Sequence, residues 1–323
     1  MGIYIAKRFL FMIPILLGIT LLSFFVIHLA PGNPLTEQLG LNPRVSASSR
    51  LMLAKLYGLN KPLIAQYLDW LRRIITLNFG VSFTANHEPV ITEIKRTIGI
   101  TILINSLAMF FIFIFSIPLG VLSAVKHDTL FDKITTVLVF IGFAAPSFWV
   151  ALLLIIFFGV DLHILPIGGI ASTGYALLSA PEKIADAAKH LVMPVFVAGF
   201  GGVAGLSRYL KGNMLEVYRQ EYITAARAKG LKERAVIYRH AMKNALIPFI
   251  TILGLSIPGL IGGSVIIETI FDINGMGRLF YQSVLARDYP TIMGILVIGA
   301  VLTLIGNLIA DVAYAAVDPR LRK

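Results

Sequence analysis

Long apolar runs separated by polar segments dominate this sequence. A stretch of about 20 apolar residues is long enough to cross the hydrocarbon core of a bilayer as a helix. Six such runs occur, at residues 9–29, 98–125, 134–160, 191–210, 246–267 and 290–317. The pattern predicts an all-α integral membrane protein with about six transmembrane helices.

The first apolar run follows Lys7 and Arg8 and so has the start of a secretory signal peptide. It is longer than a usual signal-peptide core, and His28-Leu29-Ala30 lacks the small-residue pattern of a cleavage site. We therefore expect residues 1–29 to form a retained N-terminal transmembrane helix.

Basic residues in the short polar segments predict the orientation. If the spans alternate, the basic residues of segments 7–8, 126–133, 211–243 and 320–323 fall on one side of the membrane. Short cytosolic loops carry an excess of Lys and Arg, so both termini are expected in the cytosol. Segment 30–97 is also basic but would lie outside, which is tolerated because loops longer than about 60 residues largely escape this rule.

The outer segment 30–97 has helical patterns of its own. Ser48 and Ser49 can cap one helix, and Pro62 can open a second. The second carries apolar residues at helical spacing: Ile64, Tyr67, Leu68, Leu71 and Ile75. We expect a small helical extracytoplasmic cap, which either covers the bundle or receives a partner.

Glycine and proline are concentrated inside the second to fifth apolar runs. The positions are Pro118 with Gly120, Gly142 with Pro146, residues 199–205, and residues 258–263. Glycine permits close helix packing, and proline bends helices. These spans are candidate walls of a gated pathway, the alternative being close packing in a rigid bundle.

Composition agrees with a membrane protein. Hydrophobic residues make up 57% of the chain and charged residues 14%, against roughly 45–50% and about 25% in soluble domains. The net charge of +11 is interpreted as cytosolic Lys and Arg facing an anionic leaflet rather than as a nucleic-acid surface. Absence of cysteine excludes disulfides and thiolate metal sites.

A polar island at residues 211–245 interrupts the apolar runs. Asn213 can cap a helix with Glu216 in its first turn, and Gly230 is the easiest place for a left-handed stop. Residues 232–243 predict a second helix, ended by Pro248.

The first island helix has features of a docking surface. Ala225 and Ala226 would keep one face thin, so that the helix can enter a groove on another protein, with Tyr222, Arg227 and Lys229 around it. The alternative is an amphipathic helix lying on lipid headgroups.

The island resembles a known family. Tyr222-Ile-Thr-Ala-Ala-Arg-Ala-Lys-Gly-Leu231 and Arg239-His-Ala-Met-Lys-Asn-Ala-Leu-Ile-Pro248 are similar to the EAA loop of binding-protein-dependent ABC importers, in the form carried by dipeptide and oligopeptide permeases. Thr224 stands where the general motif has an acid, a departure typical of the peptide branch. Further fragments in family order include Pro31-Gly-Asn-Pro34, Asn78-Phe-Gly-Val-Ser-Phe83, Pro146-Ser-Phe-Trp149, His190-Leu-Val-Met-Pro194, Gly275-Met-Gly-Arg-Leu279 and Asp318-Pro-Arg-Leu-Arg322.

This resemblance implies type I ABC importer architecture in a bacterial or archaeal plasma (inner) membrane. Residues 98–317 would form a five-helix permease core containing the coupling loop 211–245, and 318–323 a cytosolic tail. A first span close to Met1, followed by a long outer loop, is similar to the B-type permease subunit. The implied partners are a C-type permease, ATP-binding subunits of one or two kinds that hold ATP and Mg, and an extracytoplasmic substrate-binding protein.

The resemblance also assigns roles. The residues implied in ATPase docking and coupling are Glu221, Tyr222, Thr224, Ala225, Ala226, Lys229, Gly230, Leu231 and His240. The implied cargo is peptides, and related permeases carry nickel chelates, glutathione or oligosaccharides.

Other residues bear on alternative functions. The sequence has no Gly-x-x-x-x-Gly-Lys-Ser/Thr pattern and none of the common zinc-hydrolase or serine-hydrolase motifs, so we expect a non-catalytic chain without a metal or cofactor of its own. The only full charges in the apolar runs, Arg208 and Asp311, lie near their cytosolic ends, which disfavours proton coupling. An ATP-independent secondary transporter or channel stays the alternative. His28, Asn105 and Asn307 either face a substrate pathway or tie helices together.

Overall fold

The structure, a computed structural model, describes residues 2–29, 55, 58, 60–84 and 87–317. These residues are helical apart from their connecting loops, and their only strand-like pairing is an isolated bridge between Val81 and Pro89. The prediction of an all-α protein is confirmed. The predicted helix at Ser48 and Ser49, the 31–34 fragment and the tail 318–323 lie outside the described residues.

Four helices in the described part are long and apolar enough to cross a membrane. They lie within α1 (Gly2–Leu29), α5 (Val90–Val125), α8 (Ala180–Tyr218) and α15 (Tyr289–Val317). A fifth span is present if α6 (Leu130–Ala144) and the following helix, α7 (Ser147–Leu154) with η1 (Ile155–Asp161), count as one. The chain is thus a multi-pass helical protein whose described residues contain four or five apolar spans, where the sequence predicted about six.

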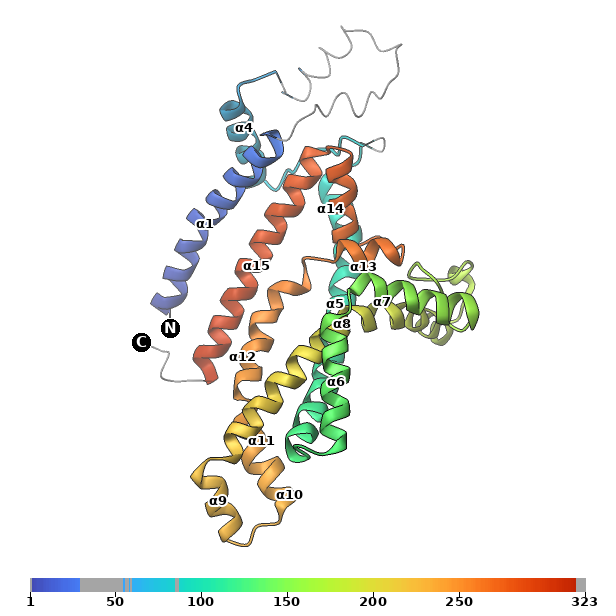
Figure 1. The fold of residues 1–323 in the computed structure, drawn as a ribbon. Helices are drawn as coiled ribbons and strands as arrows, with labels where there is room; N and C mark the ends of the chain where they lie inside the picture. The colour runs from blue at the N-terminus through green and yellow to red at the C-terminus, as the bar shows by residue number, and fades with distance from the viewer. Residues whose placement is uncertain (1, 30–54, 56–57, 59, 85–86, 318–323) are drawn as a thin grey trace. The chain divides into compact units, whose positions relative to one another are not determined.

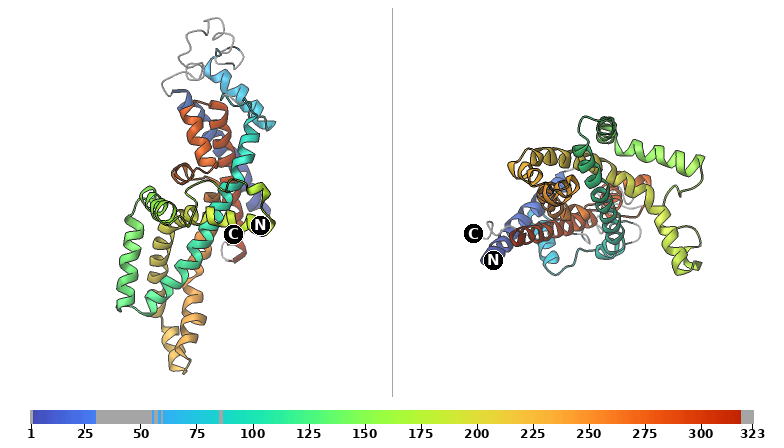
Figure 2. Two further views of the ribbon diagram at one scale, coloured as in Figure 1. Left: turned by 90° about the vertical axis from the view of Figure 1, so that its right-hand side faces the viewer. Right: turned by 90° about the horizontal axis from the view of Figure 1, so that it is seen from below.

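The third predicted span, 134–160, is sharply bent. Helices α6 and α7 meet at 103°, and Figure 2 shows this corner in green. Pro146 precedes α7, and Ala145 before it is extended, with φ −72° and ψ 124°. The cause is steric, because a residue before proline is pushed out of the helical region.

The fifth predicted span, 246–267, is not a continuous helix. It divides into α12 (Ile247–Ser256), the short 3-10 helix η4 (Ile257–Leu260) and α13 (Val265–Ile270). Pro258 and the Gly262-Gly263 pair lie at the break, and Gly263 has φ +63°. Apolar composition alone predicted one continuous helix that is too long. Proline and a left-handed glycine interrupt the helical hydrogen bonding of this segment.

The structure consists of two compact units. The first contains α1, α4 (Leu63–Ile75), the start of α5, α14 (Met276–Leu285) and α15. In it α1 packs along α15 (Figure 1), and Phe79, Val90, Ile94 and Met276 form a buried cluster. Helix α4 begins directly after Pro62, which confirms the second predicted helix of the outer segment.

The second unit contains the rest of α5, α6 to α12, and most of α13. A short 3-10 helix, η2 (Tyr175–Leu177), precedes α8. Helix α8 opens at Ser179, whose backbone N–H donates to the Glu182 carboxylate at 2.8 Å. It continues for 39 residues to Tyr218 and packs against α6 (Figure 1).

Glycines permit close helix packing within the second unit, as predicted. A Cβ on Gly120 would lie 2.8 Å from the Leu210 Cβ, and one on Gly202 would lie 2.4 Å from the Ile112 Cδ1. Helices α5 and α8 therefore pack closely at these positions, and α8 is a long, well-supported element that leads directly into the polar island.

Candidate functional site

The polar island folds as a helical hairpin at the end of α8. Helix α9 (Glu221–Ala228) forms its first arm. The second arm contains α10 (Glu233–Ala235), the π-helical segment η3 (Val236–Ala241) and α11 (Met242–Ala245). We call residues 221–245 the α9–α11 hairpin. Figure 1 shows it in yellow and orange between α8 and α12.

The first arm begins later than predicted. Asn213 does not cap a helix but lies inside α8, and extended Gln220 is the residue that precedes α9. The reason is tertiary: Leu210 and Met214 of α8 are completely buried in the core of the second unit, which favours continuation of that helix. Glu221 occupies the first turn of α9, where the helix dipole favours an acid.

The turn between the arms is a Schellman motif. Gly230 has φ +74°, the Gly230 N–H donates to the Arg227 carbonyl at 2.9 Å, and the Leu231 N–H donates to the Ala226 carbonyl at 3.4 Å. This is the paired bonding expected at a helix that ends in a left-handed residue. An added Cβ on Gly230 would meet no atom within 4 Å, so backbone conformation alone favours glycine there.

Buried apolar residues anchor the hairpin to the membrane helices. Ile223 of α9 is fully buried and packs with Leu210 and Met214 of α8. The same cluster includes Val121 and Ala124 of α5, Val236, Ile237, Ala241 and Ala245 of the second arm, and Phe249 of α12. Helix α9 is therefore packed directly against residues near the ends of α5 and α8.

Ala226 belongs to this buried cluster and not to the exposed face. Its side chain is only 6% exposed, so the expectation that it forms part of a docking surface is wrong. Its small size instead lets α9 approach the second arm closely. Ala225, one residue earlier, is exposed, because neighbouring residues of a helix point about 100° apart.

The outer face of the hairpin carries most of the predicted docking residues. Tyr222 and Leu231 are each 41% exposed. Glu221, Thr224, Ala225, Lys229 and Gly230 are exposed as well, and His240 is half-buried in η3. The structure brings the first seven together on α9 and its turn, and places His240 on the other arm.

Two polar contacts join the arms. The Arg227 guanidinium forms a fork with the Glu233 carboxylate, at 2.7 Å from Nη2 to Oε1 and 3.1 Å from Nε to Oε2. Hydrogen bonding from Arg227 lowers the pKa of Glu233 below its ordinary value. The Asn244 Nδ2 donates to the Tyr222 hydroxyl at 2.7 Å. The sequence analysis did not predict either pair. A signal for the first was present, because Arg227 and Glu233 lie three residues before and three residues after Gly230.

The second arm adds an exposed aromatic residue that sequence reasoning missed. Tyr238 is 47% exposed and lines a surface hollow of about 420 Å³ with Lys232, Arg234 and Ala235. This arm contains the π segment, a helical irregularity that often occurs at functional positions.

Two of the predicted pathway residues, His28 and Asn307, belong to the first unit. His28 stacks on Phe24 with ring centroids 3.9 Å apart, and its Nδ1 lies 2.8 Å from the Phe24 carbonyl oxygen. It lines a cavity of about 520 Å³ in the first unit with Gln66, Trp70 and Tyr289 among others. Asn307 is half-buried on α15.

Asn105 serves as a tie between helices. Its Nδ2 donates to the Leu260 carbonyl oxygen at 2.9 Å and approaches that of Gly259 at 3.4 Å. Both carbonyls belong to η4, at the break in the fifth predicted span. Asn105 also lines a mainly apolar cavity of about 340 Å³ in the second unit.

Comparison with known proteins gives consistent matches. The family described as "Binding-protein-dependent transport system inner membrane component" matches residues 116–323. The chain is 45% identical to the oligopeptide transport system permease protein AppB of Bacillus subtilis, covering 99% of both chains. It is 36% identical to the dipeptide transport system permease protein DppB of Alkalihalophilus pseudofirmus, over 99% of both. Its identity to DppB of Escherichia coli strain K12 is 33%, over 99% of this chain and 98% of the other.

Proposed function

The chain belongs to the binding-protein-dependent transport system inner membrane components, and on that premise we propose that it forms half of the membrane pathway of an ATP-driven peptide importer. It is a multi-pass inner membrane protein. Peptides are proposed as cargo because the similar proteins are named as oligopeptide and dipeptide permeases. Nickel chelates, glutathione and oligosaccharides are the competing cargoes.

Three kinds of partner complete the proposed importer. A C-type permease forms the other half of the pathway, a substrate-binding protein delivers cargo from outside, and one or two kinds of ATPase subunit bind ATP and Mg. This chain is the non-catalytic part. In the proposed orientation, which rests on the basic residues of the short loops, both termini and the α9–α11 hairpin are on the cytosolic side, where the ATPase works.

The observation that carries the proposal is the division of α9 into a buried and an exposed side. A helix that lies on lipid headgroups turns its apolar side outward to the membrane. In α9 the large apolar residue Ile223 is fully buried in the protein, whereas Tyr222, Thr224 and Ala225 are exposed. This arrangement supports docking to a protein over anchoring to lipid.

The hairpin also has the stiffness that coupling requires. Helix α9 is joined to α8 through a two-residue link at Arg219 and Gln220 and is fixed by the buried cluster. In the proposed mechanism, closure of the ATPase pushes on the exposed side of α9. The load passes through Ile223 to α8 and α5, which changes the pathway between inward-open and outward-open states.

The proposal is tested by capture and transport with one variant and a matched control. Ala225→Trp enlarges the exposed side of α9. Ala185→Trp makes the same change at an exposed alanine of α8, about 50 Å from α9 along that helix at 1.5 Å per residue. We expect Ala225→Trp to lose most of the ATPase that co-purifies with the chain, and Ala185→Trp to retain it.

Transport in proteoliposomes supplies the second readout. Peptide uptake by the purified complex with its binding protein should require ATP, and Ala225→Trp should abolish it. Uptake that continues without ATP would favour a secondary transporter or channel. Normal ATPase capture by Ala225→Trp would show that the exposed side of α9 is not the docking surface.

A further inference from the structure

The second unit contains a cavity with a cationic rim beside the turn that joins α5 to α6. Its volume is about 320 Å³. Residues of α5, the turn after it, α6 and α8 line it, so it is enclosed by one compact unit. Its lining divides into cationic and hydroxyl side chains, such as Arg208, Lys211 and Thr136, and apolar ones, such as Val139 and Leu215.

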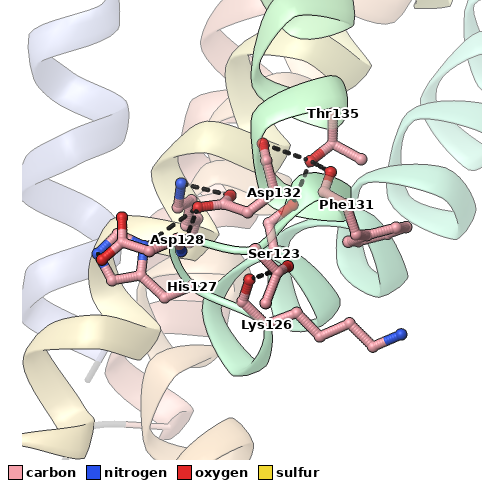
Figure 3. Close-up of polar contacts among 9 residues, drawn as sticks. Ser123, Lys126, His127, Asp128, Phe131, Asp132 and Thr135 are labelled. Carbon is pink, nitrogen blue, oxygen red and sulfur yellow. Dashed lines mark hydrogen bonds and ion pairs between the residues drawn. The ribbon is translucent and has the colours of Figure 1, made fainter.

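The two cations on the rim differ in how they are compensated. The Lys211 ammonium lies 2.6 Å from the Asp132 carboxylate, whose side chain is only 6% exposed. Asp132 also accepts a hydrogen bond from the Asp128 backbone N–H and lies 3.1 Å from the His127 Nδ1, as Figure 3 shows. This network fixes α8 to the α5–α6 turn and neutralises Lys211.

The same network argues against a metal ion there. His127, Asp128 and Asp132 present ligand atoms within 4.8 Å of one another. However, the Lys211 ammonium already occupies the buried carboxylate. A divalent cation would have to displace an internal ion pair, so the cluster is interpreted as structural.

Arg208 is the cation without a compensating acid. Its guanidinium lies 4.8 Å from the centre of the Phe140 ring, and no carboxylate within the described residues pairs with it. It belongs to an apolar span and its side chain is exposed. Because Arg208 lies near the predicted cytosolic end of its span, its guanidinium can reach the depth of the lipid headgroups.

We propose that this cavity binds the phosphate headgroup of an anionic phospholipid, with Arg208 as the main ligand. Guanidinium donors match phosphate oxygens in pairs. Apolar side chains of α6 beside the cavity are exposed, including Ile134 at 51%, Phe140 at 50% and Ile141 at 54%, and they offer a surface for an acyl chain. The lipid is taken from the cytosolic leaflet, an assignment that rests on the proposed function for the orientation of the hairpin.

The site has a consequence for coupling. Arg208 and Lys211 precede α9 on the same continuous helix, α8. A bound lipid would therefore hold α6 and α8 together directly above the α9–α11 hairpin, on the segment that carries load from the ATPase.

Lipid retention by the intact complex tests the proposal. The complex is purified in nanodiscs of phosphatidylcholine mixed with phosphatidylglycerol, released, and weighed by native mass spectrometry. We expect the complex with the unaltered chain to retain phosphatidylglycerol. The complex with Arg208→Gln should retain at most about one fifth as much phosphatidylglycerol, since one basic residue near an anionic surface contributes roughly a factor of five in affinity.

A second variant alters the cavity wall and leaves the charge unchanged. Gly212 lines the cavity, and an added Cβ there would meet no atom within 4 Å, so Gly212→Phe adds a bulky ring at the cavity wall without a clash at the Cβ. Gly205 lies two turns earlier on α8, has equally open space and does not line the cavity. Gly205→Phe is the matched control and should retain phosphatidylglycerol.

The outcomes separate the lipid from other sources of counter-charge. The proposal would be overturned if Arg208→Gln and Gly212→Phe both retained as much phosphatidylglycerol as the unaltered chain. Loss of retained lipid on adding inorganic phosphate would assign the site to free phosphate instead, and no retained lipid in the unaltered complex would assign the counter-charge to a partner subunit. Failure of the proposed function would show separately, as absence of ATPase from a complex with unchanged lipid content.

Discussion

The turn of the α9–α11 hairpin offers the sharpest test of the coupling role proposed for this hairpin. Gly230 has φ +74°, and an added Cβ would contact nothing within 4 Å. Gly230→Ala therefore introduces no clash inside this chain, and its cost is the left-handed conformation itself, about 1–2 kcal/mol. Gly230→Asn should cost less, since asparagine tolerates that conformation better.

Gly230→Pro is a different perturbation. Proline fixes φ near −65°, far from the observed value. It also removes the N–H that donates to the Arg227 carbonyl at 2.9 Å, so the turn must rebuild at a cost of about 3 kcal/mol or more. The buried residues of α8 are untouched, and we expect the protein to stay in the membrane while α9 loses its fixed position.

The assay is the number of ATP molecules hydrolysed per peptide imported in proteoliposomes, with hydrogen exchange at the turn as a structural readout. Coupling should weaken in the order Asn, Ala, Pro, and exchange should rise in the same order. Full coupling in Gly230→Pro would refute the idea that this turn transmits force. If Gly230→Ala were as damaging as Gly230→Pro, a partner contact at this position would be the limiting factor and not the backbone.

The remaining predictions concern the buried cluster, the Arg227 to Glu233 pair and the close contact at Gly277. Ala226→Leu overpacks the buried cluster and should lower the free energy of unfolding by about 1–3 kcal/mol, measured by thermal unfolding, whereas Ala225→Leu on the exposed side should leave it nearly unchanged. Glu233→Gln should reduce hairpin stability only slightly, because its pair with Arg227 is exposed. Since the folded pKa of Glu233 is lowered, the pair contributes above the unfolded value of about 4.3 and is lost as pH falls through the folded pKa. The protection of the hairpin amides, measured as the exchange rate relative to the intrinsic rate at the same pH, should therefore be flat near neutral pH and fall only in acid. Gly277→Ala should sharply reduce the yield of folded protein in detergent, because its Cβ would lie 2.7 Å from the Val265 backbone nitrogen, and a normal yield would show that this loop can move aside.

The α9–α11 hairpin is packed into the core of the second unit through residues of both arms. Ile223 and Val236, one from each arm, are fully buried with Met214 of α8. Reducing that attachment should uncouple hydrolysis from uptake even when ATPase capture is normal. A docking defect and a transmission defect can thus be separated by comparing Ala225 variants with Ile223 variants.

Local features of the sequence were read correctly where the physics is local. Gly230 was expected to end a helix in the left-handed region, and it does. Pro62 was expected to open a helix with Tyr67 on its apolar side, and α4 begins at Leu63 with Tyr67 buried. Both follow from short-range sterics and helical periodicity, which need no knowledge of the rest of the chain.

Tertiary packing decided where the residues of the polar island lie and which of them are exposed. Asn213 has the chemistry of a helix cap, but burial of Met214 keeps α8 helical past it. Ala225 and Ala226 are indistinguishable as letters, yet one is exposed and the other is buried. The direction of α9 relative to its core is set by Ile223 and its contacts on α8, and no local rule contains that information.

By itself, the sequence determined that this is a helical membrane protein, which segments are apolar, where a glycine stop must fall, and which family it resembles. Only the tertiary structure decided that Asp132 compensates Lys211 across 79 positions of sequence, and that Arg208 nearby has no such partner in the described part. The physical reason is that composition and periodicity act over a few neighbouring residues. Charge compensation and close packing depend on distances between segments that only folding brings together.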